Sequence, residues 1–285
     1  MLPSPLAAAA APHSWDYVVV TTKALPERSD DAALVAPLIG PDTAVVLIQN
    51  GVGVEAPYRA RFPSNPIVSA VTIISAEQTS PGTVRQNRWT RIHLGPYSHS
   101  ATEGGSVDAT LEALGLERAN EIGNWWTRLG GIRDVEISDE LGLQVIRWHK
   151  LCINAAFNPS AVLSGGRGNA DMVRDPELRA HLKGVMEEIW EAVPRILGRA
   201  FPEDLATPEK ILKSTERNVG SKPSMLLDWE GGRMMEIEVI LGNPVRIARG
   251  KGVELRRMQS LYALLKSVQG VREGSKGKGK GKGKL

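Results

Sequence analysis

Cysteine is nearly absent from this chain, because Cys152 is the only one in 285 residues. A lone cysteine cannot form an internal disulfide, so the sequence favours a reducing compartment and predicts a cytoplasmic protein. The five histidines show no metal-ligand spacing with one another or with Cys152. We therefore expect no zinc site or other metal site.

Long apolar runs are absent as well. None approaches the roughly 18 residues that a membrane-spanning helix needs, so no membrane partner is expected. The alanine-rich start, residues 1–15, has no basic residue at its beginning, and prolines flank its short apolar core. A secretory signal needs a basic start and a longer apolar core. Residues 1–15 are therefore predicted to be a disordered leader.

The body of the chain has no excess of positive charge, although the net charge is +3 and the pI about 9.0. Five lysines lie in the Gly-Lys repeat between residues 276 and 284, and leaving them out gives 3 − 5 = −2. This near-neutral body argues against a nucleic-acid partner. A glycine and lysine repeat cannot bury apolar surface, so residues 271–285 are predicted to be a disordered tail.

Two kinds of pattern divide the remaining chain. The first part alternates β-branched apolar runs, typical of strands buried on both faces, with helical segments. Its expected strands are 16–22, 43–49, 67–76, 83–87, 90–94 and 133–138, with 83–87 and 90–94 paired as a hairpin. Its expected helices are 27–38, 53–61 and 107–129. The second part is almost wholly helical, with helices at 176–197, from about 223, and at 256–268. We predict an α/β domain with a mostly parallel sheet at 16–138 and a helical domain at 139–270.

One helix of the second part carries polar groups on an otherwise apolar surface. Within residues 148–159, Lys150, Asn154 and Asn158 stand at i, i+4 and i+8, so they share one helical face. The residues between them are apolar, which is typical of a buried helix. Buried polar groups are costly unless they have partners or a ligand, so we favour a functional role. The alternative is a bundle helix whose polar face is solvated. Pro159 is expected to end the helix.

Two further polar positions follow expected strands. Lys23 comes after the first strand, and Asn50 of the Asn-Gly pair comes after the second. Ligands collect at the carboxyl ends of strands in open α/β sheets. The alternatives are a solvated lysine and an ordinary Asn-Gly turn. The cleft between two such domains is the expected place for a small-molecule site.

A fourth candidate segment lies in the helical part. Ser224, Asp228 and Glu236 share a slowly drifting face if one helix runs through them. Gly231 and Gly232 weaken that helix, so it either tolerates them through packing or bends there. The alternative is ordinary capping and surface charge.

Taken in order, these segments resemble the ketopantoate reductase (2-dehydropantoate 2-reductase) family. The resemblance is carried by Asp-Tyr-Val-Val-Val-Thr-Thr-Lys at 16–23, Leu-Ile-Gln-Asn-Gly-Val-Gly at 47–53, Trp-His-Lys-Leu-Cys-Ile-Asn-Ala-Ala-Phe-Asn-Pro at 148–159, and Ser-Met-Leu-Leu-Asp at 224–228 with Glu-Ile-Glu at 236–238. It covers about residues 16–268. It implies a Rossmann-like domain followed by an all-helical domain of the 6-phosphogluconate dehydrogenase C-terminal type.

The resemblance also implies a reaction. Hydride passes from NADPH to the keto carbon of 2-dehydropantoate, giving pantoate for pantothenate and coenzyme A biosynthesis. Lys150 stabilises and protonates the carbonyl oxygen as general acid, and Glu236 binds the substrate hydroxyl or the lysine's network. The other implied contacts are Asn154, Asn158 and Ser224 to the substrate, and Lys23 and Asn50 to the nicotinamide, with Asn50 also near the substrate. The implied partners are a small anionic 2-oxoacid and a second copy of the chain, bound through the helical domain.

The family's glycine-rich front is missing from this pattern. No Gly-x-Gly-x-x-Gly turn follows a first strand, and the strand at 16–22 resembles the family's fourth. We therefore expect a partial, N-terminally truncated Rossmann domain, either because the sequence starts too late or because cofactor binding was lost. The intact later motifs favour the first explanation, and the pattern leaves open whether this chain is active. Two other functions remain: a non-catalytic metabolite-binding or dimerising scaffold, and a reductase of another small 2-oxoacid.

Overall fold

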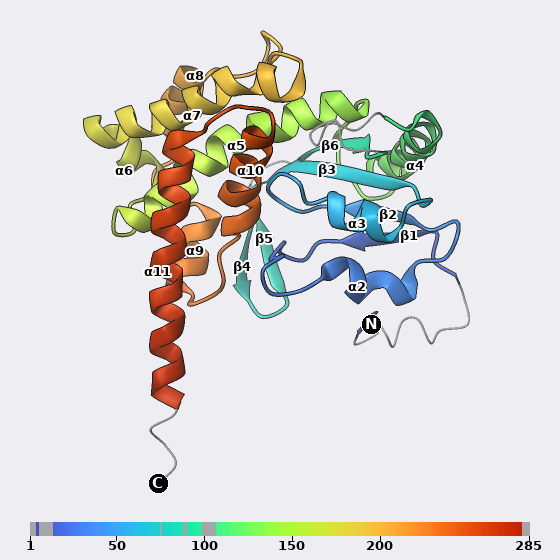
Figure 1. Ribbon diagram of the computed structural model, residues 1–285, viewed down its shortest axis with the longest axis horizontal. Helices are drawn as coiled ribbons and strands as arrows, with labels where there is room; N and C mark the ends of the chain where they lie inside the picture. Colours follow the sequence, from blue (N-terminus) through green and yellow to red (C-terminus); the bar gives the residue numbers. More distant parts are fainter. Residues whose placement is uncertain (1–3, 6–13, 75, 88–89, 99–106, 281–285) are drawn as a thin grey trace. The chain divides into compact units, whose positions relative to one another are not determined.

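The computed structural model describes residues 4–5, 14–74, 76–87, 90–98 and 107–280. The chain forms two compact units, Met1–Arg147 and Trp148–Leu285 (Figure 1). Sequence patterns place the division just before residue 139, whereas the units divide inside a long helix, α5. Residues 99–106 and most of the expected leader lie outside the described residues.

The first unit is built on a five-stranded sheet in the order β1-β2-β3-β6-β7. Its strands are β1 (Tyr17–Val20), β2 (Ala44–Leu47), β3 (Ile67–Ile73), β6 (Arg91–Pro96) and β7 (Asp134–Ile137). The pairs β1–β2, β2–β3 and β6–β7 are parallel, and β3–β6 is antiparallel. The predicted α/β class with a mostly parallel sheet is confirmed.

The predicted hairpin between 83–87 and 90–94 is wrong. Strand β5 (Thr83–Gln86) pairs instead with β4 (Ala76–Ser80) in a separate two-stranded sheet, and β6 lies between β3 and β7. The reason is burial, because every residue of β5 is exposed whereas 92–96 of β6 are buried. A strand buried on both faces is more stable inside the main sheet.

Successive residues of β2 face opposite sides of the sheet. Val45 and Leu47 pack in one apolar cluster with residues of α2 (Asp31–Val35) and α3 (Ala56–Arg61). Val46 packs in another cluster with residues of α4 (Ala109–Arg128). Figure 1 shows α2 and α4 on opposite sides of the sheet. The expected helix at 27–38 is α2 followed by a short 3-10 turn, η1 (Ala36–Leu38).

Helices make up the second unit. They are the larger part of α5 (Glu140–Leu163), α6 (Asn169–Arg174), α7 (Pro176–Leu197), α8 (Pro208–Thr215), α9 (Ser224–Glu230), the π-helical turn η2 (Glu238–Gly242), α10 (Asn243–Gly250) and α11 (Arg256–Lys280). Helix α7 matches the predicted range. It begins after the capping carboxylate of Asp175 and ends at Gly198, whose φ of 73° suits glycine.

Pro159 does not end α5, contrary to the prediction. A proline inside a helix removes one backbone hydrogen bond and costs about 3 kcal/mol. Residues 155–162 are all buried, so the packing of both turns around Pro159 opposes that loss. Tertiary burial thus outweighs a local helix-breaking signal.

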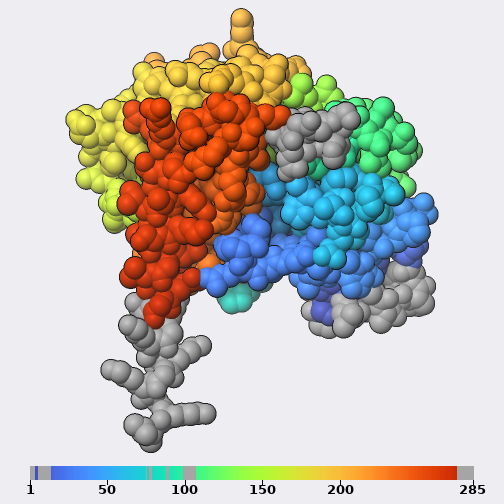
Figure 2. Space-filling view, in the orientation of Figure 1, coloured from blue at the N-terminus to red at the C-terminus, as the bar shows by residue number. Residues whose placement is uncertain are grey.

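The last helix is longer than the sequence pattern predicts. Helix α11 runs to Lys280, so 271–280 are helical rather than disordered, and 281–285 lie outside the described residues. Once a helix is formed, each added residue gains a backbone hydrogen bond, which extends it into weak helix formers. In Figure 2, α11 lies on the surface of its unit, and its Leu264 and Val271 are exposed. None of the described helices combines the length and apolarity needed to cross a membrane.

Candidate functional site

Lys23 and Asn50 occupy equivalent positions after two neighbouring strands. In the parallel pair β1–β2, Val20 is in register with Leu47. Lys23 and Asn50 each come three residues later, so both lie at the carboxyl edge of the sheet. Lys23 is exposed and Asn50 is half-buried. The sheet therefore brings an ammonium and a carboxamide to the edge at which ligands bind in open α/β sheets.

The segments that carry these two residues are joined by Gln49. The buried Gln49 amide donates hydrogen bonds to Thr22 O at 3.1 Å and to Asp31 Oδ2 at 3.3 Å. Thr22 directly precedes Lys23, and Gln49 directly precedes Asn50. Sequence reasoning missed Gln49, because a polar residue beside Asn-Gly looks like part of the turn.

Hydrogen bonds from Arg147 also hold the turn at Asn50. Arg147, from the first turns of α5, donates to Gln49 O at 3.1 Å and to Gly51 O at 2.9 Å. Gly51 has a φ of 91° and Gly53 of 71°, which glycine adopts without strain. Buried carbonyls need donors, and here one guanidinium supplies both. Sequence reasoning missed Arg147 because its partners lie far away in the chain.

In the second unit, α5 carries the three polar residues of the predicted face. Lys150 and Asn154 are half-buried, and Asn158 is 3% exposed. The amide nitrogen of Asn158 has no hydrogen-bond partner among the described residues. An unpaired buried donor costs about 1–3 kcal/mol. This nitrogen is therefore a strong candidate for binding an oxygen of a ligand.

An aromatic cluster fixes the helix next to Lys150. The rings of His149 and Trp190 lie 5.9 Å apart, those of Trp190 and Phe201 lie 4.4 Å apart, and His149 Nε2 contacts Ala206 O at 2.9 Å. Burial lowers the pKa of His149. Because a carbonyl oxygen only accepts, Nε2 is the donor in this contact. The ring contacts and this hydrogen bond indicate that His149 has a packing role.

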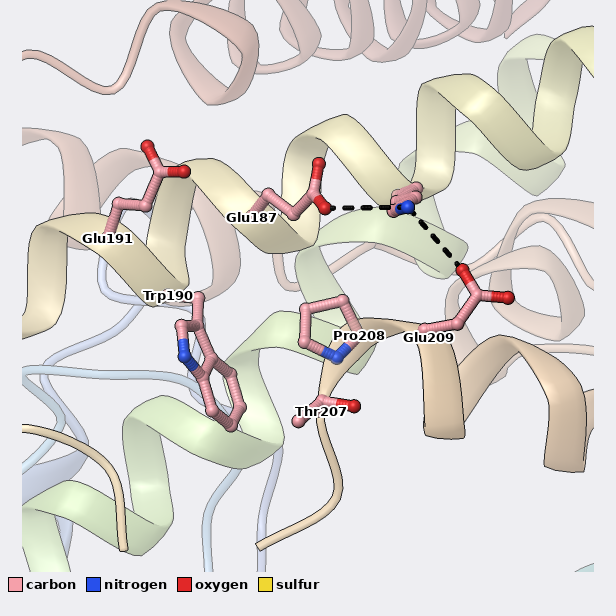
Figure 3. A pocket seen from close by; sticks show the side chains of 7 residues that line it. Glu187, Trp190, Glu191, Thr207, Pro208 and Glu209 are labelled. Carbon is pink, nitrogen blue, oxygen red and sulfur yellow. Dashed lines mark ion pairs between the residues drawn. The ribbon is translucent and has the colours of Figure 1, made fainter. Parts of the chain in front are cut away.

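A surface pocket of about 250 Å³ lies beyond this cluster, between α7 and the start of α8 (Figure 3). Its lining includes Trp190 and three carboxylates, and Lys183 forms ion pairs with two of them, Glu187 at 3.7 Å and Glu209 at 3.5 Å. None of the predicted site residues lines this pocket. Its carboxylates also make it a poor site for an anionic substrate.

Ser224 and Glu236 do not share a helix, so of the two alternatives at Gly231 and Gly232 the structure shows the one in which the chain bends. Ser224 is the exposed first residue of α9, and α9 ends at Glu230. Arg233 Nε then pairs with Asp228 Oδ1 at 3.0 Å, which closes the chain back on the helix. Because the two glycines of this turn weaken a helix, the chain leaves the helical path there.

Glu236 is buried and lies just before the π-helical turn η2. The residue before it, Met235, donates its backbone N–H to Gln269 Oε1 of α11 at 3.1 Å. Turns of π-helix occur frequently at functional sites. A buried carboxylate at such a turn fits a role in binding or proton transfer.

The two sets of side chains differ in what they can bind. An ammonium and two carboxamides along α5 suit the oxygens of a small anion, and the edge of the sheet suits a larger polar ligand. Among the described residues, no three His, Cys, Asp or Glu side chains are grouped to hold a metal ion.

Comparison with known proteins links both units to one group. The family model described as ketopantoate reductase PanE/ApbA matches residues 1–99, and the model of its C-terminal domain matches 143–269. Uncharacterized protein YDL144C of Saccharomyces cerevisiae is 30% identical over 95% of this chain and 77% of its own length. A 2-dehydropantoate 2-reductase of Nostoc sp. is 27% identical, covering 83% of this chain and 69% of that protein. The crystal structure of 2-dehydropantoate 2-reductase from Methylococcus capsulatus has a TM-score of 0.77 and 33% identity, covering 93% of this chain and 78% of that one.

Proposed function

This chain belongs to the ketopantoate reductase PanE/ApbA family, and from that premise we propose that it reduces a small 2-oxoacid with a nicotinamide cofactor. The proposed substrate is 2-dehydropantoate and the proposed hydride donor is NADPH. The product is then pantoate, which serves pantothenate biosynthesis, and the proposed location is the cytoplasm. The family membership supports an oxidoreductase; the substrate, cofactor and location are parts of the proposal.

The observation that carries the proposal is the unpartnered amide of Asn158. This buried donor lies two helical turns from Lys150, with Asn154 between them on the same face of α5. A 2-oxoacid offers carboxylate and carbonyl oxygens, and 2-dehydropantoate adds a hydroxyl; all of these oxygens accept hydrogen bonds. Binding such an oxygen recovers the cost of the unpaired donor, whereas an apolar ligand does not.

Lys150 is proposed to act on the carbonyl oxygen of the substrate. Reduction of a ketone places negative charge on that oxygen, and an ammonium both stabilises the charge and supplies the proton. Asn154 and Asn158 orient the substrate along α5, and Ser224 at the N-terminus of α9 binds its carboxylate. Glu236 binds the substrate hydroxyl or the network of the lysine. Each of these roles follows the family resemblance.

The cofactor, when bound, supplies the hydride. Lys23 and Asn50 fit its nicotinamide end, because the register of β1 and β2 brings both to the carboxyl edge of the sheet. The described glycine-rich segments are less suited to binding the pyrophosphate of the cofactor. Gly165 and Gly166 follow α5 rather than a strand.

A comparison of Lys150→Ala with Lys183→Ala, at another half-buried lysine of the second unit, tests the proposal. Lys183 lies on α7 and pairs with surface carboxylates, so its loss should leave turnover unchanged. Loss of the ammonium of Lys150 should lower kcat/KM for 2-dehydropantoate by about 100- to 10,000-fold. Turnover is measured through the oxidation of NADPH. Undiminished turnover in Lys150→Ala contradicts the assignment.

Calorimetry separates the proposal from a non-catalytic binding protein. We expect 2-dehydropantoate to bind the unmodified chain and to bind Asn158→Leu about tenfold more weakly, since one charge-assisted hydrogen bond is lost. Binding of the acid without binding of NADPH would favour a metabolite-binding protein.

A further inference from the structure

A buried ion pair lies next to the turn that contains Asn50. Arg147 Nε lies 3.0 Å from Glu55 Oε1, and the two side chains are 3% and 1% exposed. The contact has the distance of an ion pair without the angle of a hydrogen bond. Two charges removed from water remain there only when they are well paired. Each charge therefore depends on the other.

Two neutral side chains fix the carboxylate of this pair. Glu55 Oε1 accepts hydrogen bonds from Ser69 Oγ at 2.6 Å and from Gln144 Nε2 at 3.2 Å. The single hydroxyl proton of Ser69 goes to Glu55, so its oxygen is free to accept from the guanidinium of Arg147, as it does. The ion pair is thus attached to strand β3 through Ser69 and to α5 through Gln144.

The guanidinium uses its remaining donors on the backbone. One terminal nitrogen donates to Gln49 O and Gly51 O, the carbonyls of the residues on either side of Asn50. The other donates to Ala70 O at 3.1 Å. Rotation of the Gln49–Asn50 peptide or of the Gly51–Val52 peptide would break a buried, charge-assisted hydrogen bond. Each such bond is worth about 1.5–3 kcal/mol. The backbone of Asn50 is therefore fixed from both sides by one residue.

We propose that Arg147 is the positioning residue for Asn50, with Glu55 keeping the guanidinium in place. The role of Asn50 itself, contact with the nicotinamide or the substrate, rests on the proposed function. The planar guanidinium is required, because a lysine ammonium is a point charge that cannot span the same set of carbonyls and carboxylate. Arg147 touches no reacting atom in this scheme and acts through the turn at 49–51.

Arg147→Lys tests the proposal, with Arg59→Lys as its matched control. Arg59 is also a buried arginine of the first unit that donates to backbone carbonyls, but its acceptors are Phe62, Pro63, Asn65 and Tyr97. Amide hydrogen exchange of residues 49–53 should become at least about tenfold faster in Arg147→Lys and stay unchanged in Arg59→Lys. Unchanged exchange in Arg147→Lys overturns the proposal.

A double-mutant cycle with Asn50→Ala supplies the kinetic readout. Alone, Arg147→Lys should lower kcat/KM about 10- to 100-fold, because small misplacements of a contact group have effects of this size. In the Asn50→Ala background the further loss should stay below about twofold, since Arg147 then has nothing to position. An equal loss in both backgrounds indicates a general structural role and contradicts the proposal.

A second variant covers the case in which Arg147→Lys does not fold, and the exchange experiment separates this proposal from the proposed function. If Arg147→Lys does not fold, Glu55→Gln combined with Arg147→Met removes both buried charges together and leaves no unpaired one. Exchange at 49–53 should still accelerate in that variant. If the unmodified chain neither binds nor turns over the 2-oxoacid, the proposed function fails, whereas the exchange experiment still decides whether Arg147 holds the turn.

Discussion

Tyr262 donates a hydrogen bond of 2.7 Å from its hydroxyl to Oε1 of Glu238, which joins α11 to the π-helical turn η2. Lys266 of α11 contacts the same oxygen at 3.2 Å, and Arg246 of α10 donates to Oε2 at 2.8 Å. Glu238 lies two residues after Glu236. The three donors therefore hold the turn that carries the proposed binding carboxylate.

Replacing Glu238 with glutamine should lower the free energy of unfolding at neutral pH by about 1–2 kcal/mol, because charge-assisted hydrogen bonds become neutral ones. Chemical denaturation measures the change. The matched control is Glu254→Gln, whose partner Arg249 and own side chain are both more than half exposed. That change should cost no more than about 0.5 kcal/mol. Equal losses would show that the network adds nothing.

The contribution of Glu238 should depend on pH in a defined direction. Burial raises its pKa, but the hydrogen bonds from Tyr262, Arg246 and Lys266 outweigh burial and hold the pKa below the ordinary value. A carboxyl whose pKa is lowered by folding stabilises the protein above its unfolded-state pKa, about 4.3, and loses this as the pH falls through the folded-state pKa. The difference between the protein and Glu238→Gln should thus be constant above about pH 6 and shrink below about pH 4. A constant difference down to pH 3 contradicts this.

Removing the Asn158 amide should not destabilise the protein. Asn158→Leu replaces an unpaired buried donor by an apolar side chain of similar size, so the free energy of unfolding should stay the same or rise by about 1 kcal/mol. Asn65→Leu is the control, because the buried Asn65 donates to the carbonyls of Gly40, Pro41 and Thr43. That change should cost about 1–3 kcal/mol. A similar cost at both positions would mean that the Asn158 amide has a partner.

Cys152 should be unreactive in the folded protein. It is fully buried, and burial raises the pKa of its thiol, which disfavours the reactive thiolate. A chromogenic disulfide reagent should label no thiol in native buffer and one thiol in denaturant, with no ambiguity because the chain has a single cysteine. Rapid labelling of the native protein would show that α5 opens readily around Cys152.

Gly242→Ala should destabilise the π-helical turn. A Cβ there would lie 2.5 Å from Glu238 Oε2 and 3.0 Å from a ring carbon of Tyr262, so the network must shift. We expect a loss of about 1–3 kcal/mol in thermal or chemical denaturation. Gly250→Ala, at the end of α10 with open space around it, should be neutral or slightly stabilising. A neutral Gly242→Ala would show that the turn adapts freely.

Local patterns in the sequence determined much of the fold and the polar face of α5. The β-branched runs indicated β1, β2 and β3, because such residues favour strands. Every residue of β2 is buried, as expected of a strand covered on both faces, whereas Val19 of β1 is exposed. The spacing of Lys150, Asn154 and Asn158 placed them on one face, because helical periodicity depends only on neighbours in the chain. The positions of Lys23 and Asn50 after two strands likewise predicted their common edge.

Tertiary structure alone decided the features that depend on distant pairing. Strand β6 joined β3 rather than β5 because burial, not proximity in the chain, selects a partner strand. Helix α5 passed through Pro159 because packing on both sides outweighed the local cost. The pairing of Arg147 with Glu55 has no signature in either segment, since a buried charge is recognised only by what surrounds it. The sequence by itself thus determined which side chains face together within each element, and the packing between elements decided which of them are held in place.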